Sequence, residues 1–431
     1  MDPIDYVFSL EKLGIKFGLR NIGVLCEALG HPERAYQSVI VAGTNGKGSV
    51  TAMVDTALHA AGLATARYTS PHLIRLEERF VLNGRPVDSR QLRDVASLMP
   101  SLVARLRERD DLHAEPTFFE VTTAIGFELF RRARVDVAVL EVGMGGRFDA
   151  TSIAPASAAA VTSIDFDHER YLGNTLAQIA FEKAGVIKPG IPVVVGESKE
   201  EPLAVIANAC RERGATLVRA HDGVTAQTRL IDGRTDLVLE TPRRRYPPMR
   251  LALRGRHQVG NAIVATRLLE ELERLGHPVA GQAIVAGLTE VAWRGRLDLV
   301  ITDGGPVLFD GAHNPAGATV LAAYLDEVYP AGLPMLFGAM ADKDAASMLR
   351  ILLPHATRLI ATRPRTPRAR PAEQLADVAR SVGNVEVEVV EPAIEALRHA
   401  QQFGSPVLVA GSIFLIGDLM ADLGESARPM P

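Results

Sequence analysis

The chain has 431 residues, enough for two or three domains, with the hydrophobic share (47%) and charged share (23%) of an ordinary globular protein. A formal net charge of −4 excludes a bulk positive field that would recruit nucleic acid or an acidic membrane. Only two cysteines occur, and the N-terminal segment lacks a signal-peptide pattern, which excludes a disulfide scaffold and predicts a soluble cytoplasmic protein.

The most informative segment is Ser38–Ala61, where a β-branched apolar run precedes a glycine-rich loop and an alanine-rich helical pattern. Glycines let backbone N–H groups surround phosphate oxygens, the helix N-terminus adds its dipole, and Lys47 adds a full charge. The match to G-x-x-x-x-G-K-[ST] is imperfect, because position 41 is Val and Gly48 separates Lys47 from Ser49. The segment predicts a variant phosphate-binding loop or a glycine-rich turn with another role.

Strand and helix patterns alternate through the N-terminal part, after helical segments within 1–37 that polar residues at 17–21 interrupt. The expected strands are 63–68, 135–142, 158–164 and 191–195, and the expected helices are 89–107, 117–133, 175–184, 258–274 and 280–289. Such alternation predicts a doubly wound α/β domain with a parallel sheet. The hairpin signal Asp232-Gly233 predicts a small antiparallel sheet within 224–253.

A second alternating pattern follows near Trp293–Asp298 and predicts another α/β domain. Its expected strands are 307–310, 334–338, 357–361, 386–390 and 406–410, and its expected helices are 316–328, 343–352, 372–381, 392–401 and 413–422. We place the domains at 1–296 and 297–431. A cleft between two such domains is a usual place for a ligand site.

Polar residues follow several predicted strands of the first domain, where ligands of parallel sheets bind. Ser70-Pro-His72, Glu141 and Asp165-Phe-Asp-His168 stand at such ends. A carboxylate and an imidazole beside phosphates suggest a Mg²⁺ site. The sequence has no Cys/His cluster of the kind that would suggest zinc. Glu141 could instead form a buried salt bridge, and His168 could be an ordinary loop histidine.

Other residues allow a structural explanation beside a functional one. Lys183 at a helix end could simply complement the helix dipole, which the residues alone favour. Asn314 before Pro315 could be an N-cap, although that leaves Asp310 and His313 in the same turn unexplained. The basic run at 241–248 predicts a solvated loop more than a nucleic-acid site, because no wider basic surface supports it.

Taken together, the sequence resembles the folylpolyglutamate synthases and dihydrofolate synthases of the ATP-dependent Mur ligase superfamily. The resemblance covers nearly the whole chain and rests on the ordered motifs AGTNGKGS, YTSPHL, FFEVTTA, LEVGMGGRFDATS, DHERYLG, EKAGVIK, GRHQVGNA, WRGRLD, FDGAHNP, GAMADKD and GSIFLIG. It implies a P-loop ATPase domain followed by a Rossmann-like domain. It also implies that ATP phosphorylates a substrate carboxylate and that the amino group of L-glutamate then attacks the acyl phosphate, releasing ADP and phosphate.

The resemblance also implies roles for particular residues. The family's ATP-phosphate residues match Gly46, Lys47, Gly48 and Ser49, and its other nucleotide contacts match Asn261, Arg296 and Asp310. Its magnesium ligands match Ser70, Glu141 and His168, and its carbamylated lysine, which would help to hold a second Mg²⁺, matches Lys183. Lys47, Lys183, Asp310 and His313 are the implied catalytic residues.

For the substrates, the resemblance implies a pterin pocket at two segments and a glutamate contact at Ser412. The pocket residues are Gly18, Leu19, Arg20, Asn21, Thr117, Phe118, Phe119 and Glu120. The family's more usual acidic residue after Gly-Leu is replaced here by Arg20, so the detailed pterin contacts differ. We expect a monomer that uses ATP, L-glutamate and dihydropteroate, reduced folates or both.

Two rival functions remain open at this point. Another Mur-type amino-acid ligase would share the fold, and a substrate screen would separate it from a folate enzyme. A P-loop regulatory protein would bind nucleotide without glutamate-dependent ADP release, although Arg296, Asp310 and His313 argue against it. A structural protein would not require this row of polar strand ends.

Overall fold

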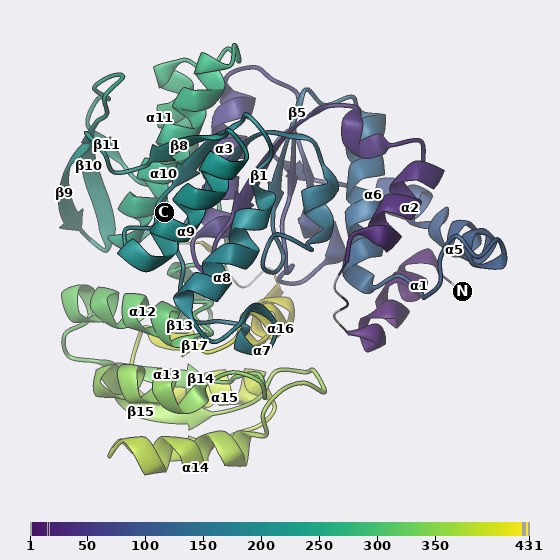
Figure 1. Cartoon of the computed structure of the whole chain (residues 1–431). Helices are drawn as coiled ribbons and strands as arrows, with labels where there is room; N and C mark the ends of the chain where they lie inside the picture. Colours follow the sequence, from purple (N-terminus) through teal and green to yellow (C-terminus); the bar gives the residue numbers. More distant parts are fainter. Residues whose placement is uncertain (1, 15, 17, 425–427, 430–431) are drawn as a thin grey trace. The chain divides into compact units, whose positions relative to one another are not determined.

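The computed structural model describes residues 2–14, 16, 18–424 and 428–429, which form two compact units. The first unit comprises Met1–Gln227, Val238–Met249 and Gly260–Val291, and the second comprises Thr228–Leu237, Arg250–Val259 and Ala292–Pro431. Figure 1 shows the elements of both units. The domain boundary placed after residue 296 stays a prediction, because the second unit also includes two segments from before residue 260.

Within the described residues, the first unit is built on an eight-stranded sheet of order β4-β3-β2-β5-β1-β6-β7-β8. The strands from β2 to β8 in that order run parallel, whereas β3 and β4 continue the edge antiparallel. Strand β5 is buried along its whole length, as expected for a sheet covered on both faces. The strands are β1 (Gln37–Ala42), β2 (Thr65–Tyr68), β3 (Phe80–Leu82), β4 (Arg85–Pro86), β5 (Val137–Glu141), β6 (Ala156–Val161), β7 (Pro192–Val195) and β8 (Thr216–Arg219).

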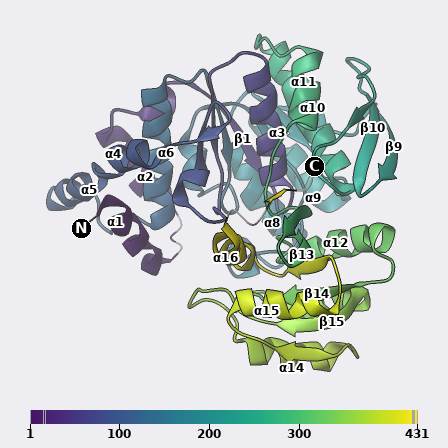
Figure 2. The same cartoon turned by 180° about the vertical axis from the view of Figure 1, so that it is seen from behind.

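Helices cover this sheet, and their ends follow local sequence signals. Helix α6 begins where the Thr117 and Glu120 side chains cap each other's backbone N–H groups, and Gly287 of α11 packs against Ala57 of α3. Figure 2 shows α3 and α11 side by side from behind. The helices are α1 (Pro3–Ser9), α2 (Arg20–Ala28), α3 (Lys47–Ala60), α4 (Ser89–Ala96), α5 (Met99–Glu108), α6 (Phe118–Ala133), α7 (Glu169–Leu172), α8 (Leu176–Lys183), α9 (Glu200–Glu212), α10 (His257–Arg274) and α11 (Gly281–Thr289).

A small sheet of order β11-β10-β9 confirms the predicted hairpin. Asp232 and Gly233 both have positive φ and connect β9 to β10, as the Asp-Gly pair predicts. The strands are β9 (Thr225–Ile231), β10 (Arg234–Glu240) and β11 (Met249–Arg250).

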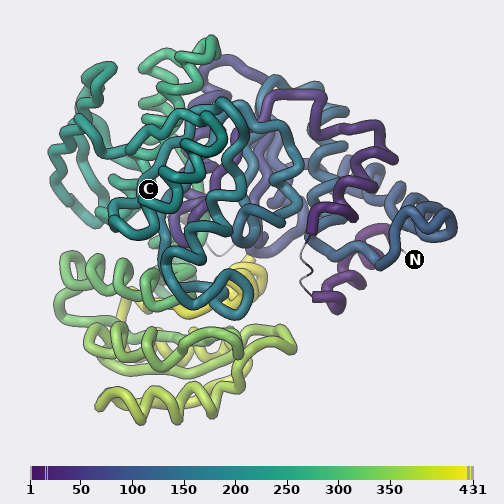
Figure 3. The backbone as a smooth tube through the Cα atoms, viewed as in Figure 1, coloured from purple at the N-terminus to yellow at the C-terminus, as the bar shows by residue number. Residues whose placement is uncertain are grey.

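In the part of the second unit that the structure describes, a seven-stranded sheet has the order β16-β15-β14-β17-β13-β12-β18. Strands β16 to β13 are parallel and β12 is antiparallel to both of its neighbours. The strands are β12 (Asp298–Thr302), β13 (Gly305–Phe309), β14 (Leu333–Phe337), β15 (Ala356–Ala361), β16 (Val387–Val389), β17 (Val407–Ala410) and β18 (Arg428–Pro429). Figure 3 shows that they come from the green-to-yellow end of the chain.

Helices lie on both faces of this second sheet. Helix α13 lies in front of the sheet in Figure 1, whereas α15 lies in front of it in Figure 2. The helices are α12 (Pro315–Val328), α13 (Ala345–Leu352), α14 (Ala372–Val382), α15 (Ala393–Ala400) and α16 (Ile413–Leu423). The predicted second α/β domain is therefore confirmed.

The structure corrects the prediction in a few places. The single helix expected at 89–107 is two helices, α4 and α5, because Pro100 cannot continue a helix and instead stands in the first turn of the second. The polar interruption expected at 17–21 includes Phe17, which lies outside the described residues, while Arg20 and Asn21 already belong to α2. Strands β3, β4, β8, β12 and β18 and helices α7 and α9 were not predicted; most of these elements span only two to five residues, whereas α9 has 13 residues and was missed.

Candidate functional site

The polar strand ends of the first unit meet at one edge of its sheet. Val41 of β1 pairs with Glu141 of β5, and Ala42 pairs with Val161 of β6. Tyr68 of β2 pairs with Leu140, which brings the following residue pair, Thr69 and Ser70, beside the end of β5. The carboxyl ends of these parallel strands thus assemble the residues that a ligand would meet.

The glycine-rich loop of residues 43–49 turns directly into α3. Gly46 has φ 85° and is the N-cap of the helix, so Lys47, Gly48 and Ser49 form its first turn. The Lys47 Nζ donates to the carbonyl oxygens of Gly43 at 3.1 Å and Thr44 at 3.0 Å. The ammonium group therefore lies over the loop, with the helix N-terminus beside it, an arrangement that favours an anion.

Residues after β6 hold this loop in place, and the sequence analysis did not single out two of them, Thr162 and Ser163. The Thr44 N–H donates to the Ser163 carbonyl at 2.7 Å, and the Thr162 Oγ1 donates to the Asn45 carbonyl at 2.6 Å. The Thr44 hydroxyl also bonds to the backbone of Asp165. The signal was available, because Thr162 and Ser163 directly follow a buried strand of the same sheet.

Lys183 lies at the same place although it is 136 positions from Lys47 along the chain. It is the last residue of α8, its side chain is buried, and its Nζ donates to the Gly43 carbonyl at 2.7 Å. Burial, together with the positive charge of Lys47, lowers the pKa of Lys183 to about 7. This is not the position of a surface lysine that merely complements a helix end.

The three predicted magnesium ligands differ in their surroundings. Glu141 is buried, and its Oε2 accepts a hydrogen bond from the Ser70 N–H at 3.1 Å. His168 is the N-cap of α7 with φ 52°, and its Nε2 lies 3.9 Å from Asp167 Oδ1. Within the described ranges, no three His, Cys, Asp or Glu side chains gather as a metal-binding group. Of the three predicted ligands, Ser70 and Glu141 are in contact through the hydrogen bond of the Ser70 N–H.

Asn261 approaches the loop from α10. A Cβ at Gly46 would clash with the Asn261 amide, so this side chain lies directly against the turn that precedes Lys47. Glycine is required at this position both by its positive φ and by this close approach. The predicted nucleotide contact and the predicted phosphate loop are therefore neighbours.

The two predicted substrate segments also meet. The Asn21 amide donates to Glu120 Oε2 at 3.4 Å, and the same carboxylate oxygen accepts from the Thr117 N–H at 2.7 Å. Gly18 and Leu19 lead into α2, whose exposed first residue is Arg20. Much of the Glu120 carboxylate is therefore engaged in the helix cap.

Two aromatic rings and one arginine contact the aromatic pair of Phe118 and Phe119. Phe118 stacks on Phe8 with ring centroids 5.8 Å apart, and the guanidinium of the buried Arg79 lies 5.0 Å from the Phe118 ring. Phe119 packs on Tyr68 with centroids 6.0 Å apart. Arg79 was not predicted, since a single arginine outside a strand end gives no sequence signal.

In the second unit, the turn after β13 contains a buried carboxylate. Asp310 accepts hydrogen bonds from the Leu297 N–H at 2.9 Å and the Ala312 N–H at 3.0 Å. The Arg296 guanidinium lies against Gly311, where it would clash with a Cβ. Burial raises the pKa of Asp310, whereas the Arg296 charge and the two backbone N–H groups act in the opposite direction.

The neighbouring residues of this turn have clear local roles. Asn314 caps α12, because its Oδ1 accepts from the Gly317 N–H at 2.7 Å, which confirms the N-cap explanation. His313 Nδ1 lies 2.9 Å from the Gly311 carbonyl oxygen. Ser412 is buried and caps α16, and the preceding Gly411 N–H donates to the Ala312 carbonyl at 3.0 Å. Ser412 and His313 therefore stand at adjacent strand ends.

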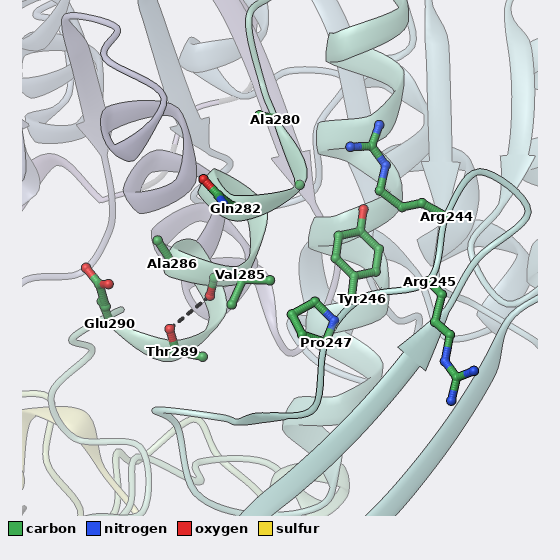
Figure 4. A pocket seen from close by; sticks show the side chains of 11 residues that line it. Arg244, Arg245, Tyr246, Pro247, Ala280, Gln282, Val285, Ala286, Thr289 and Glu290 are labelled. Atoms are coloured by element: carbon green, nitrogen blue, oxygen red, sulfur yellow. Dashed lines mark hydrogen bonds between the residues drawn. The ribbon is translucent and has the colours of Figure 1, made fainter.

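The basic run is largely solvated, as predicted, but it also borders a pocket. Arg244 and Tyr246 face the start of α11 across a cavity of about 480 Å³ (Figure 4). Arg244 pairs with Glu273, and the Tyr246 hydroxyl donates to Glu270 at 3.0 Å. Both side chains are therefore engaged in bonds within the protein.

Comparison with known proteins extends these observations. Residues 295–413 match the family model described as "Mur ligase, glutamate ligase domain". The chain is 33% identical over 425 residues to the dihydrofolate synthase/folylpolyglutamate synthase of Bacillus subtilis, covering 97% of each chain. No helix within the described residues is long and apolar enough to cross a membrane.

Solved structures agree with the sequence comparison. Mycobacterium tuberculosis folylpolyglutamate synthase, solved with ADP and AMPPCP, is 32% identical with a TM-score of 0.90, and the match covers all of both chains. A bifunctional folylpolyglutamate synthase/dihydrofolate synthase, solved with Mn, AMPPNP and L-glutamate, is 30% identical with a TM-score of 0.83 over 98% of each chain. With these identities and this coverage, the chain belongs to the dihydrofolate synthase/folylpolyglutamate synthase family of Mur ligases.

Proposed function

We propose that this protein is an ATP-dependent ligase that joins L-glutamate to dihydropteroate, to reduced folates or to both. The observation that carries the proposal is the contact of Lys47 and Lys183 with one carbonyl, at the N-terminus of α3. The Lys47 ammonium group and the N-terminus of α3 lie at one place, an arrangement that favours an anion such as a phosphate group of ATP. Family membership supports glutamate as the second substrate.

The reaction consists of two balanced steps. A substrate carboxylate oxygen attacks the γ-phosphorus of ATP, ADP leaves, and an acyl phosphate forms. The amine of L-glutamate then attacks the acyl carbon, phosphate leaves, and the ammonium proton is lost to form the amide. Lys47 and the loop N–H groups hold the phosphates in line and stabilise the charge that develops on them.

The residues at the strand ends fit a magnesium ion. Mg²⁺ usually takes one or two protein carboxylates together with phosphate and water, so it does not need a cluster of three acidic or imidazole ligands. Glu141 supplies a buried carboxylate beside Ser70, and His168 stands on the loop after β6. When bound there, Mg²⁺ would neutralise phosphate charge and favour phosphoryl transfer.

A carbamate on Lys183 would complete a second magnesium site. Its formation joins the amine nitrogen to CO₂ and releases one proton, so it needs a neutral amine. The buried position of Lys183 and its pKa near 7 support this, because a substantial fraction of the amine is then neutral at physiological pH. The carbamate would replace a repulsive cation beside Lys47 with an anion.

The same proposal includes nucleotide contacts from Asn261, Arg296 and Asp310. It also includes glutamate contacts from His313 and Ser412, and a monomeric protein. The chain segments near Phe118 and Phe119 are the proposed pterin pocket.

The test is ADP release by the purified protein with Mg-ATP and L-glutamate, with dihydropteroate and tetrahydrofolate supplied separately. Release that requires glutamate and either pterin compound supports the proposal and identifies the substrate. Release with neither compound would contradict it and would favour another Mur-type amino-acid ligase, which the same assay with other acceptor acids would detect.

A further inference from the structure

The carboxyl end of β7 bears a buried carboxylate that has no part in the proposed reaction. Glu197 stands two residues after this strand and is 7% exposed. Its Oε2 accepts from the Ile164 N–H at 2.6 Å, and its Oε1 accepts from the N–H groups of Ser198 and Lys199, both at 2.8 Å. Lys199 is the N-cap residue of α9. The carboxylate therefore ties the loop after β6 to the start of that helix.

The Lys199 side chain binds the same loop after β6. Its Nζ donates to the Ile164 carbonyl oxygen at 2.6 Å and to Asp165 Oδ1 at 2.5 Å, and it lies 3.9 Å from Glu197 Oε2. Ile164 is thus held through both of its backbone polar groups, its N–H by Glu197 and its carbonyl by Lys199. An exposed ion pair alone contributes little, but these bonds also fix the backbone of a loop.

The residue after Ile164 is bonded to the glycine-rich loop of residues 43–49, the proposed phosphate loop. The Asp165 N–H donates to the Thr44 hydroxyl at 3.0 Å, and this hydroxyl donates to the Asp165 carbonyl oxygen at 3.1 Å. Lys47 in turn donates to the Thr44 carbonyl at 3.0 Å. A path of hydrogen bonds therefore leads from Glu197 and Lys199 through the loop after β6 to the Lys47 ammonium group.

The sheet places the three strand ends of this path side by side. Strands β1, β6 and β7 are neighbours in the strand order, and a Cβ at Gly196 would lie 2.7 Å from the Thr162 carbonyl oxygen. Glycine restricts the backbone little, so a glycine-rich loop depends on contacts from outside for a fixed conformation. Phosphoryl transfer requires such a conformation, because a misplacement of about 1 Å can lower its rate about 100-fold.

We propose that Glu197 and Lys199 are positioning residues, which hold the phosphate loop in its nucleotide-binding conformation through the loop after β6. The inference rests on the proposed function, since it assigns both residues to the binding of the ATP phosphates. They act without touching the nucleotide. A purely structural role would lower stability and would leave the nucleotide affinity of the folded protein unchanged.

The experiment measures the dissociation constant for ADP by titration calorimetry, with Mg²⁺ present, on the full-length protein well below its unfolding midpoint. Lys199→Met should weaken ADP binding about tenfold, the scale of one charge-assisted hydrogen bond. Lys199→Arg should bind ADP nearly as tightly as the wild type, because it keeps a cation with N–H donors. Glu197→Gln should also weaken binding, because its amide NH₂ cannot accept the N–H bonds of the carboxylate oxygen that it replaces.

A double-variant cycle tests the route of this effect. Thr44→Val removes the hydroxyl that bonds to Asp165, and it should weaken ADP binding by itself. Because Lys199 acts through this hydroxyl, Lys199→Met should add little in a protein that already carries Thr44→Val. Effects of the two substitutions that multiply would overturn the inference, since Lys199 would then influence the nucleotide by another route.

Lys188→Met is the matched control, since the Lys188 Nζ likewise donates to a backbone carbonyl, that of Ser152, within the same unit. It should leave the ADP affinity at the wild-type value. A lower unfolding midpoint of Lys199→Met with unchanged ADP affinity would overturn the inference while leaving the proposed function intact. A wild type that binds no ADP would overturn both.

Discussion

The charged side chains gathered after β1 and after β13 make opposite kinds of hydrogen bond with the backbone. After β1, two ammonium groups, those of Lys47 and Lys183, donate to a single backbone carbonyl, that of Gly43. After β13, one carboxylate, that of Asp310, accepts from two backbone N–H groups and has Arg296 nearby. At the first end two side-chain amines approach one carbonyl, whereas the carboxylate at the second is hydrogen-bonded within its own turn.

This difference indicates how substitutions after each of the two strands should act. A buried carboxylate with two N–H donors is well accommodated and fixes the turn of residues 310–314. Burial and the nearby charge of Lys47 disfavour a charged Lys183, and the loop with its helix N-terminus favours an anionic ligand. We therefore expect substitutions of Lys47 and Lys183 to act on catalysis, and a substitution of Asp310 to act on stability in addition to the nucleotide contact proposed for it.

The largest expected effect is that of Lys47→Ala. Removing the ammonium group from the phosphate loop should lower the rate of acyl-phosphate formation about 1,000-fold, because it removes a charge aimed at the transferring phosphoryl group. Trapping of the acyl phosphate with hydroxylamine would measure this step. Acyl-phosphate formation at the wild-type rate would contradict the phosphate-loop assignment.

Lys183→Ala should lower turnover about 100-fold while changing the midpoint of thermal unfolding little, because a buried amine is costly to the fold. The matched control is Lys188→Ala, since Lys188 donates to the Ser152 carbonyl at 2.5 Å in the same unit. Turnover that follows the loss of folded protein, with full specific activity in the folded fraction, would refute a functional role for Lys183.

At the other end, Asp310→Asn should lower the free energy of unfolding by about 1–3 kcal/mol, measured by urea denaturation. The amide NH₂ would face the Leu297 or the Ala312 N–H, and one of these buried donors would lose its acceptor. Asp303, which is exposed in the turn between β12 and β13, is the control and should tolerate asparagine. An unchanged free energy of unfolding would contradict a stabilising role for the two hydrogen bonds that Asp310 accepts.

The smallest effect concerns pH. Burial, with the charge of Arg296 nearby, lowers the pKa of His257 from 6.5 to about 4. Between these values the unfolded chain binds a proton that the folded protein does not, so stability should fall as the pH falls from 6.5 towards 4. His257→Gln should make this decline shallower by about 2 kcal/mol at pH 5, as urea denaturation at pH 5 and pH 7 would measure.

Much of the fold was predictable because its patterns are local. The strand-loop-helix of Ser38–Ala61, the buried run that became β5, and the alternation after residue 297 each carry their periodicity within a few residues. Helix α6 was predicted at nearly its observed bounds, Phe118–Ala133, because a cap and an apolar face stand next to each other in the sequence. The resemblance to a ligase family likewise depended only on the order of motifs.

What the tertiary structure decided is which distant residues share a place. The sequence alone favoured a helix-end role for Lys183, and only the packing of α8 against the loop after β1 brings it to Gly43. The same holds for Thr162 and Ser163 under the phosphate loop, for Arg79 beside Phe118, and for Lys199 beside Asp165. Burial and charge proximity, which set the pKa of Lys183, arise from contacts across the fold, so no local pattern could have given them.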